Sequence, residues 1–249
     1  MIQMRIYYFS KKHLLTASVI IIMAFGFLSV AFLNKDNTII AAGTDQPIFQ
    51  GNTGTKSVAI TVNVDWGEEF IPSMLDEFKK NNALVTFFVT GRWAENNPEL
   101  LKQMAAAGHS IQNHGYKHVH FNQLSSAQVT SEIKKAEDII FGITGVRSSF
   151  FASPYGEYNS QLVRTVNSIN YQYIMWSADT IDWQRPDPST IVNRVIKKVH
   201  NDAIILMHPT EPTVKALPEM LKQLREQNYQ MITIDKITGG KIDASGNSQ

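Results

Sequence analysis

The feature that most constrains the fold of this chain is the alternation of short apolar runs, rich in β-branched and aromatic residues, with longer helix-like segments. The expected strands are Val58–Val64, Leu84–Val89, Ser110–Gln112, Ser149–Ala152, Tyr173–Trp176, Ala203–Met207 and Met231–Ile234. The expected helices are Phe70–Asn81, Pro98–Ala107, Ser125–Phe141, Ser160–Asn170, Pro188–Asn201 and Val214–Gln227. Strand–helix alternation predicts an α/β fold with a parallel sheet and helices outside it.

Seven expected strands favour a (β/α) barrel, distorted or incomplete, and an open doubly wound sheet is the alternative. Both folds place the functional site at the carboxyl ends of the strands. No internal repeat or low-complexity segment interrupts residues 57–238, so we expect one globular domain there, large enough for a substantial core.

The N-terminus predicts a membrane segment. Residues 14–33 carry no charge and are apolar, small or hydroxyl-bearing, and the flank at residues 1–13 is basic. A helix of this length can cross a bilayer core of roughly 30 Å. We therefore expect a single-pass anchor, a cytoplasmic flank and a domain on the outer face of the cell membrane. The alternative is a signal peptide cleaved near Ala41 and Ala42, which would release a secreted domain.

Composition narrows the remaining classes. Residues 34–56 are rich in Asn, Thr, Gly, Asp and Gln, so we expect a linker there and a flexible tail at residues 239–249. The chain has no cysteine, so any metal ion must be held by histidine and carboxylate. Its net charge is +1 and it has no basic stripe, which argues against a nucleic-acid partner. We expect a monomer.

Two histidines, His114 and His118, lie four residues apart directly after the expected third strand. Imidazoles at this spacing can share one face and aim at one divalent ion. Histidine pairs at this spacing also occur as surface or capping residues, so the spacing alone leaves both interpretations open.

Polar residues follow several other expected strands as well. They are Asp65, Asp179, Asp182 and His208. Residues with unrelated core or capping roles would be spread over both ends of the strands. Because these all fall at carboxyl ends, they are expected to converge on one site.

Five motifs in order make the chain resemble the NodB-homology polysaccharide deacetylases, carbohydrate esterase family 4, especially the membrane-anchored and sporulation-associated members of Gram-positive bacteria. The motifs are the Asp segment at Ala59–Gly67, His-x-x-x-His at His114–His118, Pro-Tyr-Gly at Pro154–Gly156, Asp-x-x-Asp-Trp at Asp179–Trp183 and Leu-x-His at Leu206–His208. The resemblance covers about residues 56–238. It implies hydrolysis of N-acetyl groups on an extracytoplasmic cell-wall glycan by a divalent metal ion, usually zinc.

The resemblance also implies roles for single residues. It assigns metal binding to His114 and His118. It makes His208 the general acid, with Asp182 orienting and charging that imidazole. Such a set suits amide hydrolysis, which needs a water of lowered pKa, stabilisation of the tetrahedral oxygen and a proton for the leaving amine.

The resemblance further places substrate-binding residues around the acetyl group. Trp183 and Leu206 would be walls of the acetyl pocket. The backbone of Tyr155, which follows Pro154 in the turn, would donate to the oxyanion.

Two departures from the family pattern affect the expected activity. The family has two adjacent Asp residues after Thr-Phe, a general base and then a metal ligand, whereas this chain has Asn63 in the base position. An amide cannot take a proton in the useful pH range. The Arg that neutralises the base is replaced by Ala152 or Ser153. The general-base Asp and the Arg that neutralises it are therefore both missing. This is the pattern expected of a charge pair, because either residue buried without the other would be costly.

Asp65 lies two residues beyond Asn63 and therefore on the same face of an extended strand. We assign Asp65 as the third metal ligand and as a catalytic residue. The water would then be activated by the metal alone, by Asp65 in a double role, or by Glu68 or Glu69. These two glutamates fit the first turn of a helix better than they fit a catalytic role.

Other candidates are assigned structural roles. We expect His109 to be a capping or core residue, His120 a surface residue beside the cleft and Asp179 a brace of its loop. Of the four tryptophans that could stack on sugar rings, Trp93 and Trp176 are expected in the core.

Three functions fit the sequence. The first is a metal-dependent deacetylase of an N-acetylated cell-wall glycan. The second is a catalytically weakened or inactive glycan-binding protein on the same fold, which Asn63 and Ala152 motivate. The third is a barrel hydrolase that acts on a different amide or ester.

Overall fold

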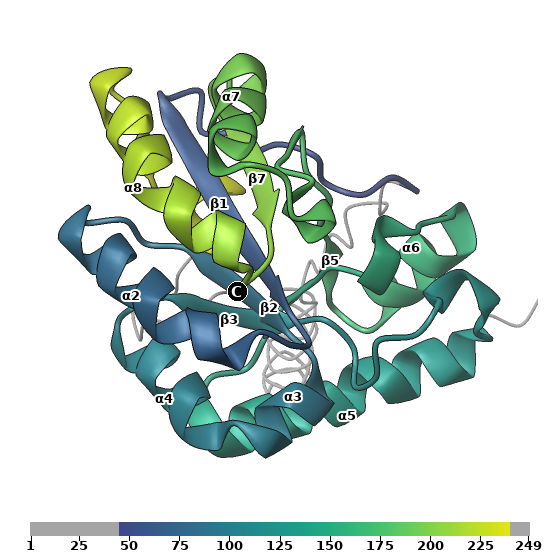
Figure 1. Cartoon of the computed structure of the whole chain (residues 1–249). Coiled ribbons are helices and arrows are strands. Elements are labelled where there is room, and N and C mark those ends of the chain that lie inside the picture. Colours follow the sequence, from purple (N-terminus) through teal and green to yellow (C-terminus); the bar gives the residue numbers. More distant parts are fainter. Residues whose placement is uncertain (1–44, 240–249) are drawn as a thin grey trace, which may run out of the picture. The chain divides into compact units, whose positions relative to one another are not determined.

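Parallel strands build the centre of the computed structural model, which describes residues 45–239 (Figure 1). Within this range the strands are β1 (Ser57–Val64), β2 (Thr86–Val89), β3 (Ser110–Asn113), β4 (Phe150–Phe151), β5 (Gln172–Tyr173), β6 (Ala178–Asp179), β7 (Ala203–Met207) and β8 (Gln230–Met231). Seven of them lie in the order β5-β4-β3-β2-β1-β7-β6, and β8 pairs with β1 off this path. The α/β architecture with a parallel sheet is therefore confirmed for the described residues.

The sheet is an open half-barrel rather than a closed barrel. The strands at its two ends, β5 and β6, are consecutive in the chain and are joined by residues 174–177. In the described part of the chain, β5 pairs with β4 and β6 pairs with β7, and no ladder joins β5 to β6. The expectation of an incomplete barrel is confirmed in this form.

Helices connect the strands and cover the outside of the sheet (Figure 1). They are α2 (Ile71–Lys80), α3 (Gly91–Asn96), α4 (Pro98–Ala106), α5 (Ser126–Thr144), α6 (Ser160–Ser168), α7 (Pro188–Lys198), α8 (Glu211–Glu226) and α9 (Ile234–Ile237). Short 3-10 turns are η1 (Glu68–Phe70), η2 (Phe121–Gln123), η3 (Pro154–Gly156) and η4 (Asp182–Gln184). Ser125 caps α5 in a capping box with Gln128, as its position in the sequence predicted.

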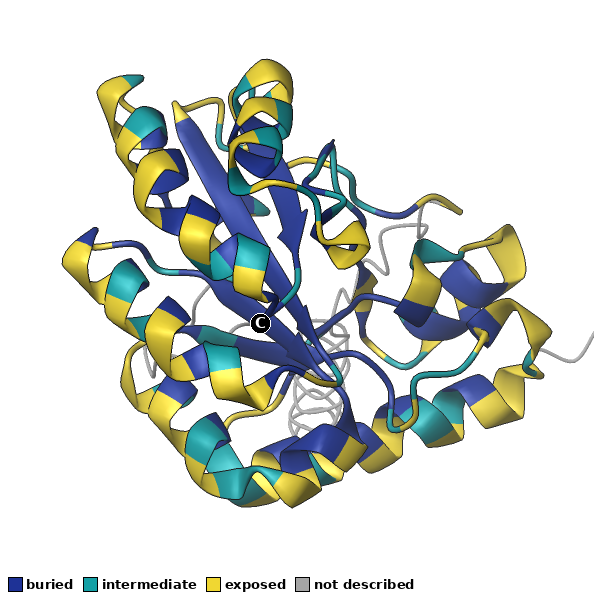
Figure 2. Cartoon of the chain, in the orientation of Figure 1, coloured by how far each residue is buried: buried dark blue, intermediate teal, exposed yellow. Residues whose placement is uncertain are grey.

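Side-chain alternation along β1 separates two packing faces. Val58, Ile60, Val62 and Val64 belong to the main core between sheet and helices, whereas Ala59 packs in a smaller inner cluster. β1 is buried throughout, and the helices expose their outer faces (Figure 2). Because side chains alternate along a strand, residues 61, 63 and 65 share the inner face with Ala59.

Three sequence-based boundaries are corrected by the structure. The predicted strand Tyr173–Trp176 overlaps only β5, which ends at Tyr173, and the sequence did not predict β6, which brings the number of strands to eight within residues 45–239. The predicted strand Met231–Ile234 ends at Met231, because Ile234 already begins α9. The predicted helix Val214–Gln227 begins earlier, at Glu211, because the Thr210 side chain accepts a hydrogen bond from the Thr213 N–H and caps that end.

The domain also begins before Ser57. Ile48 and Gln50, in the segment expected to be a linker, form bridges to Ile174 and Ala203. The predicted membrane segment at residues 14–33, its flank and the tail beyond residue 239 lie outside the described residues. Among residues 45–239 no helix has the length and apolar character needed to span a bilayer.

Candidate active site

The predicted site residues follow the carboxyl ends of neighbouring strands. Asp65 comes directly after β1, His114 after β3, and His208 after β7. Pro154 follows β4, and Asp182 follows β6 at the start of η4. The structure thus brings to one end of the sheet residues that are far apart in the sequence.

Asp182 and His208 form a tightly bonded dyad. Asp182 is fully buried, and its Oδ1 lies 2.8 Å from His208 Nδ1. Its Oδ2 accepts hydrogen bonds from the His208 backbone N–H at 2.7 Å and from the Thr213 hydroxyl at 2.6 Å. The carboxylate therefore fixes His208 in position and leaves the Nε2 side of the ring free for proton transfer.

Strained backbone precedes this carboxylate. Ile181 has a φ of 52°, which is an outlier for a β-branched residue. Its N–H donates to Asp179 Oδ1 at 2.8 Å, so Asp179 braces the loop, as predicted. Strain of this kind persists where the surrounding structure holds it, and it is frequent next to functional residues.

His114 is buried and His118 is half-buried, and both have lowered pKa values. His114 Nδ1 lies 2.7 Å from the Ala152 carbonyl oxygen, so this nitrogen carries the proton and Nε2 faces away from that bond. Burial, together with the nearby His118, lowers the pKa of His114 to about 3. Burial also lowers the pKa of His118, and the Asp65 carboxylate partly opposes this. The centroids of the two rings are 5.5 Å apart.

Asp65 is held by two donors. Its Oδ1 accepts hydrogen bonds from the Thr90 hydroxyl at 2.7 Å and from an Arg92 guanidinium nitrogen at 3.2 Å. The same nitrogen lies 3.0 Å from Oδ2. Over residues 45–239 no group of three histidine and carboxylate side chains is spaced to hold a metal ion. Both Asp65 oxygens are engaged by Thr90 or Arg92, so a metal ion held by Asp65 and the two histidines would have to displace at least one of these donors.

Asn63 occupies the inner face where the general base was expected. It is 7% exposed, and within the described structure its Oδ1 is buried without a hydrogen-bond partner. Ala152 is buried in the inner cluster. Ser153 is buried as well, and its hydroxyl donates to the Glu157 carbonyl oxygen at 2.7 Å. Neither residue supplies a charge to Asn63.

Exposed aromatic rings surround the site. Trp183 is 56% exposed and Tyr155 is 57% exposed, whereas Pro154 and Leu206 are buried. Tyr155 has a φ of 62° and stacks on His120 with ring centroids 4.1 Å apart. The predicted surface position of His120 beside the cleft is confirmed.

A third exposed ring, the indole of Trp66, stacks on the histidine of the dyad. The indole of Trp66 lies parallel to the His208 imidazole, at an interplanar angle of 7° and a centroid distance of 6.2 Å. Gly67, with a φ of 82°, permits this approach, because a Cβ there would lie 2.3 Å from the Pro209 carbonyl oxygen. The neighbouring Glu68 and Glu69 are exposed in η1, in agreement with helix first-turn residues.

Sequence reasoning missed Thr90 and Arg92. Both follow β2, and Thr90 caps α3 by accepting the Trp93 N–H at 3.2 Å. The rule that flagged residues at other strand ends would have flagged these two.

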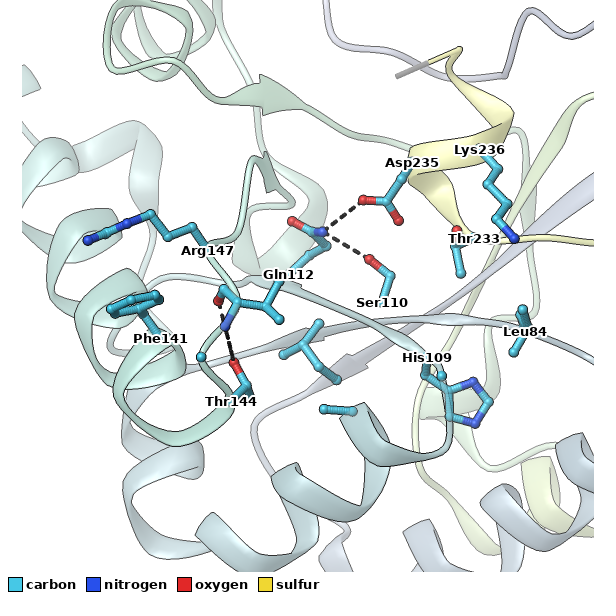
Figure 3. A pocket seen from close by; sticks show the side chains of 15 residues that line it. Leu84, His109, Ser110, Gln112, Phe141, Thr144, Arg147, Thr233, Asp235 and Lys236 are labelled. Atoms are coloured by element: carbon cyan, nitrogen blue, oxygen red, sulfur yellow. Dashed lines mark hydrogen bonds between the residues drawn. The ribbon is translucent and has the colours of Figure 1, made fainter. Parts of the chain in front are cut away.

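His109 lies at the opposite end of the sheet and is a core residue. It accepts the Val85 N–H at Nδ1, and its ring packs edge-on against Phe78 and Phe87. It lines a cavity of about 540 Å³ at the amino ends of β2 and β3 (Figure 3). There Gln112 donates hydrogen bonds to Ser110 and Asp235. This cavity is separate from the candidate active site.

A half-barrel that gathers these five motifs at the carboxyl ends of its strands defines the class of polysaccharide deacetylases. The protein-family model described as polysaccharide deacetylase matches residues 50–174. The chain belongs to this family, which is carbohydrate esterase family 4 and whose members are typically metal-dependent.

Two curated relatives illustrate the range of the family. The chain is 36% identical over 192 residues to the uncharacterized protein YlxY of Bacillus subtilis, covering 77% of this chain and 60% of YlxY. It is 31% identical over 191 residues to a peptidoglycan-N-acetylglucosamine deacetylase of Bacillus cereus, covering 75% of this chain and 70% of the relative. The match thus spans less than two thirds of YlxY.

A solved structure bears directly on activity. Wild-type BA3943 of Bacillus anthracis, described as a CE4 family pseudoenzyme, superimposes with a TM-score of 0.76 at 36% identity, covering 78% of this chain and 69% of BA3943. A BA3943 mutant described as having restored enzymatic activity matches with a TM-score of 0.76 at 34% identity, covering 78% and 72%.

Proposed function

We propose that this protein is a glycan-binding member of the CE4 family that recognises an N-acetylated, peptidoglycan-type cell-wall glycan and hydrolyses its acetyl groups slowly or not at all. The observation that carries the proposal is Asn63. A side-chain amide stands where a general base is needed, and its buried Oδ1 has no partner in the described structure. An acetamido group offers one N–H donor, which this oxygen can accept.

The rim of the site supports a sugar ligand. Exposed aromatic rings at Trp66, Tyr155 and Trp183 present apolar faces of the kind that stack on sugar rings. The Bacillus cereus relative is named a peptidoglycan-N-acetylglucosamine deacetylase. A further relative, the T48 deacetylase, whose structure was solved with substrate, is 31% identical to this chain. These relatives support a glycan as the ligand of this chain.

We also place the domain on the outer face of the cell membrane, held by residues 14–33. The uncharged run and its basic flank support this topology. Protease added to intact protoplasts should remove the domain. A soluble domain in the culture medium, with an N-terminus near Gly43, would instead indicate a cleaved signal.

A second candidate function is efficient deacetylation with a divalent metal ion, zinc in our expectation. The Asp182–His208 dyad favours it, because a buried carboxylate orients the imidazole for donation of a proton to a leaving amine. This function requires Asp65 to be free, and Asp65 is bonded to Thr90 and Arg92.

Binding and hydrolysis measured on the same samples separate the two functions. The parent should bind N-acetylglucosamine oligosaccharides and release little acetate. Trp183→Ala should weaken binding about tenfold. Phe141→Ala provides the control, because Phe141 is 38% exposed but lines the cavity at the other end of the sheet. Rapid acetate release by the parent would favour efficient deacetylation, and absent binding would contradict the proposal.

A rescue series tests the role of Asn63. Asn63→Asp alone should raise acetate release little, because the new carboxylate lacks its Arg. Adding Ala152→Arg should raise it by more than the two single effects combined, as for groups that act as a unit. Thermal unfolding must be followed in parallel, since Ala152 is buried. A double variant no faster than the parent would show that the missing pair does not limit hydrolysis.

A further inference from the structure

We infer that Arg92 is a resident cation of the site, whose guanidinium holds the Asp65 carboxylate in place of a metal ion and thereby weakens divalent-cation binding. The inference rests on the proposed function in taking Asp65, His114 and His118 as one site. To that site it adds Arg92, whose ion pair with Asp65 competes with a metal ion and lowers the affinity of the site for divalent cations.

The contacts of Asp65 carry the inference. One guanidinium nitrogen of Arg92 lies 3.0 Å from Oδ2 and 3.2 Å from Oδ1, and the Thr90 hydroxyl adds a bond to Oδ1 at 2.7 Å. The Asp65 side chain is 11% exposed. Both oxygens therefore have cationic or hydroxyl partners inside a confined space, and a metal ion would have to displace at least one of them.

The backbone fixes Arg92 between Asp65 and the loop that carries His118. The Arg92 N–H donates to the Tyr116 carbonyl oxygen at 3.0 Å, and the Gly91 N–H donates to the Gly115 carbonyl oxygen at 2.9 Å. A Cβ at Gly91 would lie 2.9 Å from the Tyr116 ring, so glycine allows this close approach. The start of α3 is thus attached to the histidine loop, and Arg92 is oriented by it.

Charge strengthens the effect of geometry. The Arg92 guanidinium is a cation. A divalent ion bound to Asp65 and the histidines would lie close to this positive charge and be repelled by it. The pair of Asp65 and Arg92 is neutral as a unit. The site is therefore suited to an uncharged acetamido group rather than to a bare dication.

Cobalt binding by the purified full-length protein tests the inference without relying on activity. Visible absorption and calorimetry report Co²⁺ affinity and coordination. Arg92→Gln should raise Co²⁺ affinity about tenfold or more over the parent. Arg92→Lys should give a smaller gain, because the charge remains while the planar fork is lost. Adding His114→Ala to Arg92→Gln should abolish the gain, which locates the ion in this site.

Arg147→Gln is the matched control. Arg147 is also exposed and pairs with a carboxylate, Glu137, at 3.0 Å, but it lies at the other end of the sheet. This variant should leave Co²⁺ affinity unchanged. Equal affinity of the parent and Arg92→Gln, or a gain that persists with His114→Ala, would overturn the inference.

The same samples separate this inference from the proposed function. Oligosaccharide binding by the parent tests the glycan proposal, whatever the cobalt result. A parent that binds Co²⁺ tightly but still binds glycan would overturn only the role of Arg92. If Arg92→Gln does not fold, Arg92→Lys provides the test. A Co²⁺ affinity of Arg92→Lys no higher than that of the parent would count against the inference.

Discussion

The two halves of the candidate active site differ in what holds them. On one side, Asp182 is fully buried and directs both of its oxygens to His208 and Thr213. On the other side, Asn63 is an amide with an unpartnered oxygen, and Asp65 pairs with the half-exposed Arg92. The first half is a fully buried carboxylate with three hydrogen bonds, whereas the carboxylate of the second half, Asp65, pairs with a side chain that is 53% exposed. Substitutions at Asp65 are therefore expected to cost less stability than substitutions at Asp182.

The largest expected effect is on the buried half. Asp182→Asn should lower the free energy of unfolding by about 4 kcal/mol, because it disrupts three hydrogen bonds to a buried carboxylate. Urea titration followed by circular dichroism measures this loss. A loss below about 1 kcal/mol would remove the distinction between the two halves.

The next largest effect on stability is expected from protonation of His109, which lies outside both halves of the site. Burial lowers the pKa of His109 to about 4, below the ordinary value of about 6.5 in the unfolded chain. The unfolded chain therefore binds the proton first, so stability is present above pH 6.5 and falls as the pH drops toward 4. The expected loss is about 3 kcal/mol at pH 4.

His109→Gln removes this titration and isolates the pH response of the active site. Unfolding free energies of the parent and the variant, measured between pH 7 and 4, should differ in slope. Parallel slopes would show that His109 does not contribute to acid destabilisation.

Contact between the halves can be broken at Gly67. Gly67→Ala should cost about 2 kcal/mol, because the φ of 82° disfavours a side chain and the new Cβ would meet the Pro209 carbonyl. Trp66 should then move away from His208, and its fluorescence should shift. Unchanged fluorescence and stability would show that the two halves tolerate separate movement.

The smallest effect is expected at the exposed pair. Asp65→Asn should change the free energy of unfolding by less than about 1 kcal/mol, because Arg92 is 53% exposed and water can replace the lost bonds. The comparison with Asp182→Asn uses the same substitution in both halves. Equal losses at the two positions would contradict the structural difference.

Much of the fold could be predicted from sequence because apolar periodicity and capping residues are local signals. Pro98 and Pro188 begin α4 and α7 as expected, and Ser125 caps α5. The two-residue strand β6 and the six-residue helix α3 were missed, since segments this short have no measurable period. Their positions are set by tertiary contacts.

The site was predictable to the extent that strand ends identify it. His114, Asp182 and His208 each follow the carboxyl end of a strand in the parallel sheet, and Asp182 is hydrogen-bonded to His208. The partner of Asp65 was not predictable, because Arg92 lies 27 residues away on a helix that the sequence pattern did not reveal. Side-chain pairing across separate βα units depends on packing that no local motif encodes.

The segment before β1 has a consequence for how the open sheet behaves in solution. The Ile48 N–H donates to the Tyr173 carbonyl oxygen and the Ile48 carbonyl accepts from the Met175 N–H, both at 2.8 Å, while the Gly51 N–H donates to the Asp202 carbonyl oxygen. These bonds occupy backbone groups in and just after β5 and directly before β7. A chain shortened to Ser57 would expose them, and an unprotected sheet edge is a template for pairing between molecules. The residues preceding β1 therefore cover backbone groups that a free sheet edge would offer to another molecule.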